Sequence, residues 1–211
     1  FGLNPNELKK TIHGVMLKTH KAEDVIINVS KNIDLIPANI EMNFIEMDVW
    51  SQIDQYKKPF HLLHDNIKDV VRHYDFVLID TPPSMGLVTG NVLACARHVI
   101  IPFVPEVFAV QGLIRMIDAI EDFRQQLNPQ LTISGIVGMM VDQRTTLHSE
   151  MLQQTRKWGI ENNVKVYDTI IPRSIRFAHA TAYESKPAVW TDRKNPIVEA
   201  YFRLTKEVFN L

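Results

Sequence analysis

Residues 74–90 read YDFVLIDTPPSMGLVTG, and this stretch predicts the fold of the chain. Val77, Leu78 and Ile79 form a short apolar run that ends at an acid, Asp80. Such a run is typical of a buried parallel strand whose two faces are covered by helices. Ligands of open α/β sheets bind beyond the carboxyl ends of the strands. We therefore expect Asp80 to project towards a bound ligand.

The residues that follow Asp80 predict a stiff turn. Pro82 and Pro83 fix their φ angles and remove two N–H donors, so the chain leaves the sheet along a restricted path. An acid at a strand tip before such a turn suits a phosphate-hydrolysing site. In that kind of site the acid holds Mg²⁺, usually through water, and the turn senses the γ-phosphate. The alternative is an aspartate that only caps the next helix.

Strand-like and helix-like segments alternate along the rest of the chain. We expect strands at residues 33–37, 77–79, 98–104, 131–141 and 164–171, and helices at residues 5–17, 39–50, 60–73, 88–96, 110–127, 146–162 and 196–209. This alternation predicts an α/β fold with a mostly parallel central sheet flanked by helices. The sequence shows no repeat and no linker, so we expect a single domain over residues 1–211.

The composition is that of an ordinary globular chain. The 211 residues are 45% hydrophobic and 22% charged, with a formal net charge of −1. Contact with DNA would therefore need a local basic patch. The single cysteine, Cys95, cannot form an internal disulfide, and this usage suits a reducing cytoplasm. No apolar run approaches the roughly 18 residues of a membrane span.

Three kinds of site lack support in the sequence. The histidines have no carboxylate or cysteine at ligand spacing, which argues against a zinc site. A Gly-x-Ser-x-Gly nucleophile elbow is absent, and so is the phosphate-binding loop GxxxxGK[ST]. Triphosphate affinity in P-loop proteins comes from the backbone N–H groups of that loop and its lysine. We therefore expect residues 1–211 alone to bind ATP negligibly.

Three motifs, in order, resemble the ParA/Soj partition ATPases, which are deviant Walker A members of the MinD/ParA superfamily. The motifs are IDTPPS at residues 79–84, HVIIPFVPE followed by AVQGL at residues 98–113, and IIPRSIRFAHATAYESKPAV at residues 170–189. The resemblance runs from about residue 33 to the C-terminus. It implies a P-loop NTPase-like fold whose N-terminal part is missing, because the chain would begin after the P-loop, the first helix and the second strand.

The resemblance also implies roles for individual residues. Asp80 is expected to be the Walker B acid that organises Mg²⁺ through water, and Thr81, Pro82 and Pro83, continuing to Ser84, are expected to form a switch loop. Pro172 and Arg173 are expected to lie against the adenine, the alternative being a plain turn with a solvated arginine. Asp142 follows a strand and could contact the nucleotide base or a neighbouring loop, or could simply start a helix.

Basic residues gather late in the chain, and the family binds DNA without sequence preference through such residues. The candidates are Arg176, Lys186, Arg193, Lys194, Arg203 and Lys206. Neutralising phosphates is sufficient for this mode of binding. The alternative is a normally charged surface, because acids such as Glu184 and Asp192 are interleaved with the basic residues.

The resemblance therefore implies an ATPase of plasmid or chromosome partition with ATP and Mg²⁺ as cofactors. The whole protein is expected to form a homodimer on binding ATP, to bind DNA, and to hydrolyse ATP with a ParB-like centromere-binding protein. We expect it in the cytoplasm, associated with the nucleoid and not with a membrane. One alternative is a P-loop-less, non-catalytic relative that binds DNA or protein.

Two other branches of the superfamily fit the sequence less well. A MinD-like membrane-positioning ATPase needs an amphipathic basic helix at its C-terminus. The last residues here, RLTKEVFNL, match the family's final helix instead. The nitrogenase iron-protein branch needs two cluster cysteines per subunit, and the one cysteine of this chain excludes it.

Overall fold

The computed structural model describes residues 1–209, with the side chains of residues 178 and 181 left aside. Its described residues form two compact units. The helical unit comprises residues 3–97 and 122–130, and the sheet unit comprises residues 1–2, 98–121 and those from 131 onward. The two units are described separately below.

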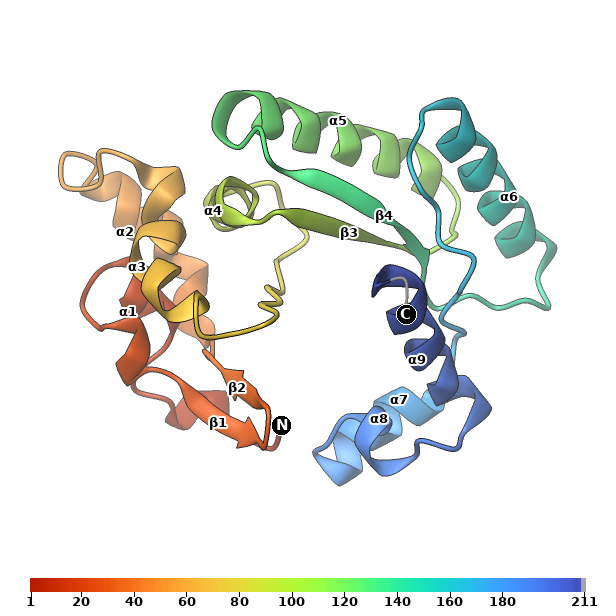
Figure 1. The fold of residues 1–211 in the computed structure, drawn as a ribbon, viewed down its shortest axis with the longest axis horizontal. Helices are drawn as coiled ribbons and strands as arrows, with labels where there is room; N and C mark the ends of the chain where they lie inside the picture. The colour runs from red at the N-terminus through yellow and green to blue at the C-terminus, as the bar shows by residue number, and fades with distance from the viewer. Residues whose placement is uncertain (210–211) are drawn as a thin grey trace. The chain divides into compact units, whose positions relative to one another are not determined.

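Short helices make up most of the helical unit (Figure 1). Its elements in chain order are η1 (Pro5–Glu7), α1 (Ile12–Met16), η2 (Ala22–Asp24), β1 (Ile27–Ser30), β2 (Ile33–Leu35), η3 (Ile40–Phe44), α2 (Ile45–Ser51), η4 (Pro59–His61), α3 (Leu62–Val71) and α4 (Leu87–Cys95). Leu63, Ile67 and Val70 recur at helical spacing on α3 and are buried in the core of this unit. The helices expected at residues 60–73 and 88–96 are therefore confirmed.

Two expected elements of this unit differ from the structure in detail. The strand expected at residues 33–37 is the shorter β2, which pairs in an antiparallel hairpin with β1 and belongs to no parallel sheet. The helix expected at residues 5–17 is split into η1 and α1. Asn4 nevertheless caps η1 as its sequence position suggests, because its side-chain oxygen accepts a hydrogen bond from the Asn6 N–H.

The apolar stripe expected at residues 39–50 is divided between the core and the surface. Ile45 and Val49 on α2 are buried, with exposed fractions of 1% and 0%. Met42 on η3 is partly buried against this core, whereas four other large apolar side chains of η3 and α2 are exposed, namely those of Ile40, Phe44, Met47 and Trp50. Only one side of α2 therefore packs into the helical unit.

The buried strand expected at residues 77–79 is wrong. Residues 76–82 have no regular secondary structure, and the side chain of Leu78 is 88% exposed. A strand exists only where a neighbouring segment satisfies its N–H and C=O groups. No described segment forms a ladder with residues 77–79, so the apolar run stays an exposed connection between α3 and α4.

A parallel pair of strands lies at the centre of the sheet unit. Strand β3 (His98–Phe103) pairs with β4 (Thr132–Gly138), and α5 (Ala109–Leu127) connects them. Figure 1 shows α5 running along these strands. Helix α5 buries Leu113, Ile117 and Ile120, and its last residues, from 122 onward, cluster with the helical unit. Pro102 is the penultimate residue of β3, a position near a strand end that tolerates its missing N–H.

The sheet unit also contains helices after β4. Its remaining elements are α6 (Thr146–Glu161), α7 (Ile175–His179), a π-helical turn η5 (Ala180–Glu184), α8 (Ala188–Thr191) and α9 (Pro196–Phe209). The helices expected at residues 110–127, 146–162 and 196–209 are confirmed by α5, α6 and α9. A parallel strand pair connected by a helix also confirms the α/β class.

A third segment runs beside β4 without forming a continuous strand. The Tyr167 N–H donates to the Ile136 carbonyl, and the Ile171 N–H donates to the Gly138 carbonyl, with N···O distances of 2.8 Å in both cases. Isolated parallel bridges join Ile136 to Val166 and Val141 to Pro172. The strand expected at residues 164–171 is therefore present only in part.

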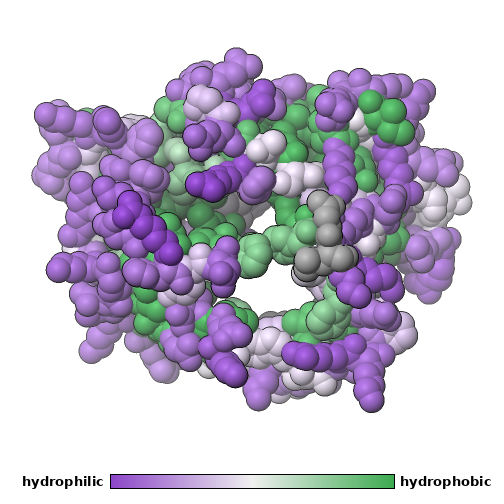
Figure 2. All heavy atoms as spheres, viewed as in Figure 1, coloured by the Kyte–Doolittle hydropathy of each residue, from purple (hydrophilic) through white to green (hydrophobic). Residues whose placement is uncertain are grey.

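Polar side chains cover much of the face shown in Figure 2, and apolar side chains also reach that surface. Within the described part of the chain, no helix combines the length and the apolar character that crossing a bilayer requires.

Candidate functional site

The loop after residue 79 presents Asp80 to solvent in the helical unit. Asp80 and the four residues that follow it, Thr81 to Ser84, are all exposed. Among the described residues, the Asp80 carboxylate makes no hydrogen bond or ion pair, so its oxygens are available to a water molecule or a cation. Two consecutive prolines restrict the backbone directly after this side chain.

The far end of the loop is fastened to α4. The Thr89 hydroxyl donates to the Ser84 carbonyl at 2.6 Å and lies 3.4 Å from the Pro82 carbonyl. The N–H of Leu87, the first residue of α4, donates to Glu46 Oε1 at 2.7 Å. The loop is therefore anchored at its C-terminal end, while its N-terminal end follows the exposed run of residues 76–79.

A buried asparagine holds α4 against the start of α3. Asn91 is fully buried, and its Oδ1 accepts a hydrogen bond from the Leu63 N–H at 3.0 Å. Its Nδ2 donates to the carbonyls of Pro59 and Leu87 at 2.8 and 2.9 Å. From its fully buried position, the amide thus provides a partner for one backbone donor and two backbone acceptors.

We expect Asn91→Ala to lower the free energy of unfolding by about 1–3 kcal/mol, because it removes the side-chain partners of the buried Leu63 N–H and of the Pro59 carbonyl. Urea denaturation followed by circular dichroism measures this change. Asn66→Ala is the matched control, since the Asn66 amide makes a single bond, to the Leu62 carbonyl within its own helix. An equal loss in both variants would contradict the anchoring role of Asn91.

The structure brings Asp142 next to Pro172 and Arg173 in the sheet unit. Val141 forms a parallel bridge with Pro172, and the Arg173 N–H donates to the Val141 carbonyl at 3.0 Å. Asp142 directly follows Val141, and Arg173 directly follows Pro172. The residues that were predicted from two separate strand ends therefore lie at the same edge of the sheet. Arg173 is exposed and Pro172 is partly buried.

Asp142 is engaged by its neighbours on the chain. Arg144 Nε donates to Asp142 Oδ1 at 2.9 Å, and Arg144 Nη2 donates to Oδ2 at 2.8 Å. These bonds hold the pKa of the Asp142 carboxyl well below its usual range. The Asp142 N–H also donates to His148 Nδ1 at 2.9 Å. The carboxylate is therefore charged and fixed at neutral pH, as a hydrogen-bond acceptor for a ligand would need to be.

The candidate basic residues fall into two groups. Five are exposed: Lys186, Arg193, Lys194, Arg203 and Lys206. The sixth, Arg176, is partly buried and bound to two carboxylates, with Nη1 2.6 Å from Glu184 Oε1 and Nε 2.8 Å from Asp192 Oδ2. The guanidinium of Arg176 thus ties α7 to the ends of η5 and α8.

The Arg176 ion pairs predict a loss of stability in acid. Hydrogen bonds from Arg176 lower the pKa of Glu184 to about 2, from an ordinary value of 4.5, and they also lower the pKa of Asp192. A depressed pKa in the folded state means that the contribution to stability is present above the unfolded pKa. It is then lost as the pH falls from about 4.5 towards 2.

We expect Glu184→Gln to be less stable than wild type at pH 7 and to lose less stability between pH 5 and pH 3, where the linkage of this carboxylate acts. Urea denaturation at several pH values measures both effects. Glu150→Gln removes an exposed acid with no such partner and serves as the control. The same pH dependence in Glu184→Gln and in wild type would contradict this prediction.

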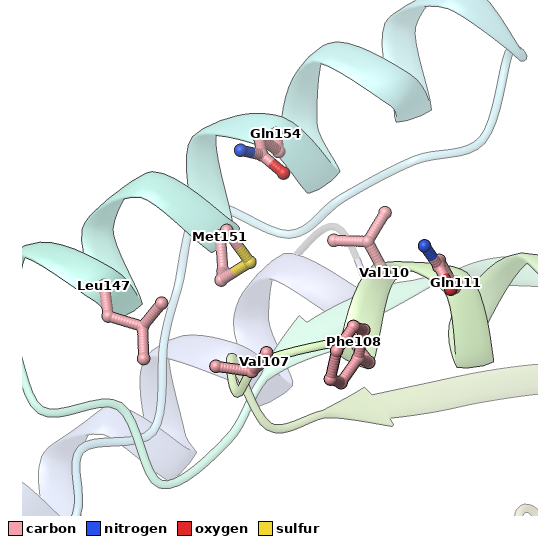
Figure 3. A pocket seen from close by; sticks show the side chains of 7 residues that line it. All are labelled: Val107, Phe108, Val110, Gln111, Leu147, Met151 and Gln154. Carbon is pink, nitrogen blue, oxygen red and sulfur yellow. The ribbon is translucent and has the colours of Figure 1, made fainter.

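A cavity in the sheet unit involves residues that sequence reasoning missed. Its volume is about 300 Å³, and it lies between the start of α5 and α6, lined by Val107, Phe108, Val110, Gln111, Leu147, Met151 and Gln154. Figure 3 shows Leu147 and Met151 on α6 and Phe108 across from them. Val107 and Phe108, which precede α5, are adjacent apolar residues in the sequence, and the structure leaves both exposed beside this cavity. The lining holds no titratable side chain, which suits apolar contact and not acid–base chemistry.

The residues around Asp80 fit one role for Mg²⁺. Among the described residues, no group of three histidine, cysteine or acidic side chains could hold a metal ion by itself. A single free carboxylate fits an ion that is held mainly by substrate phosphates and water, as Mg²⁺ commonly is. The Cys95 thiol is unsuited to reactivity, since burial raises its pKa to about 11.

Comparisons with known proteins cover the whole chain. The AAA domain family model matches residues 1–133. A ParA family protein of Mycoplasma pneumoniae is 30% identical over 100% of this chain and 80% of its own length. The chromosome partitioning protein ParA of Caulobacter vibrioides is also 30% identical, over 100% of this chain and 77% of its own length.

A solved structure has a fold similar to that of this chain. Cobyrinic acid a,c-diamide synthase of Mycobacterium smegmatis, with a bound ATP analog and magnesium, superimposes with a TM-score of 0.80 and 26% identity. That match covers 97% of this chain and 75% of the synthase. Motifs, fold and relatives agree, and the chain belongs to the ParA family of partition ATPases.

Proposed function

We propose that the protein is an ATPase of plasmid or chromosome partition that binds Mg-ATP, dimerises on binding it and then binds DNA without sequence preference. Hydrolysis, stimulated by a ParB-like partner, would then release the protein from the DNA of the nucleoid. Family membership supports the ATPase class, and the Caulobacter relative is a chromosome partitioning protein. The related synthase was solved with an ATP analog and magnesium.

The observation that carries this proposal is the exposed loop from Asp80 to Ser84. The free carboxylate of Asp80 would hold a water ligand of Mg²⁺, and the Thr81–Pro83 segment would lie beside the γ-phosphate. When bound, Mg²⁺ neutralises charge on the phosphate oxygens. The loop is anchored at Ser84 by Thr89, so its position is coupled to α4.

Asp142, Pro172 and Arg173 would contact the adenine end of the nucleotide. Their shared edge of the sheet supports this assignment, because ligands of α/β folds bind at the carboxyl ends of strands. Arg144 keeps Asp142 charged, so its carboxylate could accept a hydrogen bond from the exocyclic amine of adenine while the Pro172 ring packs on the base.

DNA binding would depend mainly on the five exposed basic residues. Each can neutralise a phosphate without giving up an internal bond to a carboxylate. Arg176 would have to leave Glu184 and Asp192 first, so we assign it the smallest share.

The test compares the full-length protein with and without Mg-ATP. We expect the protein to hydrolyse ATP and to do so faster when DNA and the partner protein are present. We also expect it to bind DNA only when ATP is present. Binding to DNA without ATP turnover would instead favour a non-catalytic relative, and binding to anionic vesicles without binding to DNA would favour a membrane-positioning ATPase.

A further inference from the structure

We propose that Glu46 is a positioning residue for the loop of residues 80–86. Its carboxylate holds the first turn of α4, and through that turn it holds Asp80 where hydrolysis of ATP requires it. This inference rests on the proposed function and adds to it a residue far from the loop in sequence.

The contact replaces a missing helix cap. The N–H groups in the first turn of a helix have no partner within the helix. Gly86 is the N-cap of α4 and has no side chain with which to cap it. Glu46 Oε1, from a residue 41 positions earlier, accepts the Leu87 N–H at 2.7 Å. A negative charge is also favoured at the positive end of the helix dipole.

Both sides of this contact are firmly placed. Ile45 and Val49, which flank Glu46 on α2, are buried in the same core as Leu87. Helix α2 packs against α4. Asn91 fixes α4 to η4 and to the start of α3 through two hydrogen bonds, with the Pro59 carbonyl and the Leu63 N–H. The Glu46 carboxylate therefore has a rigid base, and so does the helix that it caps.

A short series of bonds leads from this cap to the loop. Leu87 lies two residues before Thr89, whose hydroxyl donates to the Ser84 carbonyl. Pro82 and Pro83 have fixed φ angles, so the segment between Ser84 and Asp80 can absorb less of a shift at Ser84. Loss of the Glu46 cap would loosen the turn that holds the loop.

Gly86 offers a second way to break the same contact. A Cβ atom at residue 86 would clash with Glu46 Oε1, the flexible end of that side chain. The φ angle of Gly86 is −95°, which alanine adopts without strain. Gly86→Ala should therefore displace the carboxylate while leaving Glu46 in the sequence and the backbone of the loop unstrained.

The experiment uses the full-length protein and the variants Glu46→Ala, Glu46→Gln, Gly86→Ala and the double variant Glu46→Ala/Gly86→Ala. We expect Glu46→Ala and Gly86→Ala each to lower kcat for ATP about tenfold, with KM changed by less than about twofold, because misplaced catalytic groups act on the chemical step. The double variant should be no slower than the slower single variant, since both remove one contact. Glu46→Gln should recover part of kcat, because its amide oxygen still accepts a hydrogen bond.

Hydrogen exchange of the Leu87 amide, measured without nucleotide, reports the cap independently of activity. We expect faster exchange in Glu46→Ala and in Gly86→Ala. Glu41→Ala is the control, because Glu41 is an exposed acid on the neighbouring η3 whose carboxylate makes no hydrogen bond or ion pair among the described residues; this variant should change neither kcat nor exchange.

Taken together, the possible outcomes separate a failure of this inference from a failure of the proposed function. A wild-type protein without ATP turnover overturns both. An active wild type with Glu46→Ala within about twofold of its kcat overturns the positioning role alone. A fall in kcat with unchanged Leu87 exchange, or additive losses in the double variant, also overturns it. If Glu46→Ala fails to fold, Gly86→Ala alone decides between these outcomes.

Discussion

Asp80→Asn should reduce ATP turnover by the full-length protein by about 100-fold or more, the range expected when a group that stabilises transition-state charge is lost. The substitution keeps the size of the side chain and removes the negative charge that would organise the water ligands of Mg²⁺. Stability should change little, because Asp80 is exposed and makes no bond among the described residues. Single-turnover kinetics at saturating Mg-ATP and a urea denaturation curve measure both quantities.

Asp75→Asn is the matched control. Asp75 is exposed on the same connection, five residues before Asp80, so the two variants differ only in which acid is neutralised. We expect Asp75→Asn to retain wild-type turnover. Full turnover by Asp80→Asn, or equal losses in both variants, would remove the catalytic role from Asp80.

Binding to unrelated DNA duplexes should weaken by about 500-fold between 50 and 200 mM salt, if the five exposed basic residues each neutralise one phosphate with a log–log slope of roughly −0.9. The measurement is a fluorescence titration of full-length protein with Mg-ATP. Replacing Arg203 and Lys206 of α9 by alanine should make the slope less steep by about 2 units, independently of DNA sequence.

The double variant Lys57→Ala/Lys58→Ala removes the same charge from an exposed part of the helical unit and should leave the slope near its wild-type value. A flat salt response of the wild-type protein, or strong preference for one duplex, would point to a different mode of recognition.

Periodicity predicted the long elements because they are stabilised by one buried face. On α5, Leu113, Ile117 and Ile120 are spaced by three and four residues, and all three are buried. The β3–β4 pair could also be predicted, because one apolar run directly precedes α5 in the sequence and another follows it. Two strands connected by a helix usually pair in parallel. Asp142 and Pro172 could each be placed after a strand, and their meeting follows from parallel pairing.

Local sequence could not predict features that depend on distant partners. The run Val77–Ile79 has the composition of a strand, yet a strand also needs a neighbour, and neighbours are not encoded locally. Glu46 could not be found because its partner, Leu87, is 41 residues away. The sequence predicted Arg176 as a candidate for DNA contact. In the structure its guanidinium is instead paired with Glu184 and Asp192, which follow it in the chain.

The exposed run Phe76–Ile79 also has a consequence for the protein at high concentration. Four uncharged apolar residues, three of which favour strands (Phe76, Val77 and Ile79), form an exposed segment that can pair with copies of itself and start aggregation. Asp75 and Asp80 flank this run, and such gatekeeper charges repel an approaching copy. The acid proposed to organise Mg²⁺ therefore also helps to keep the molecules apart, and Asp80→Asn should lower the concentration at which the protein remains dispersed.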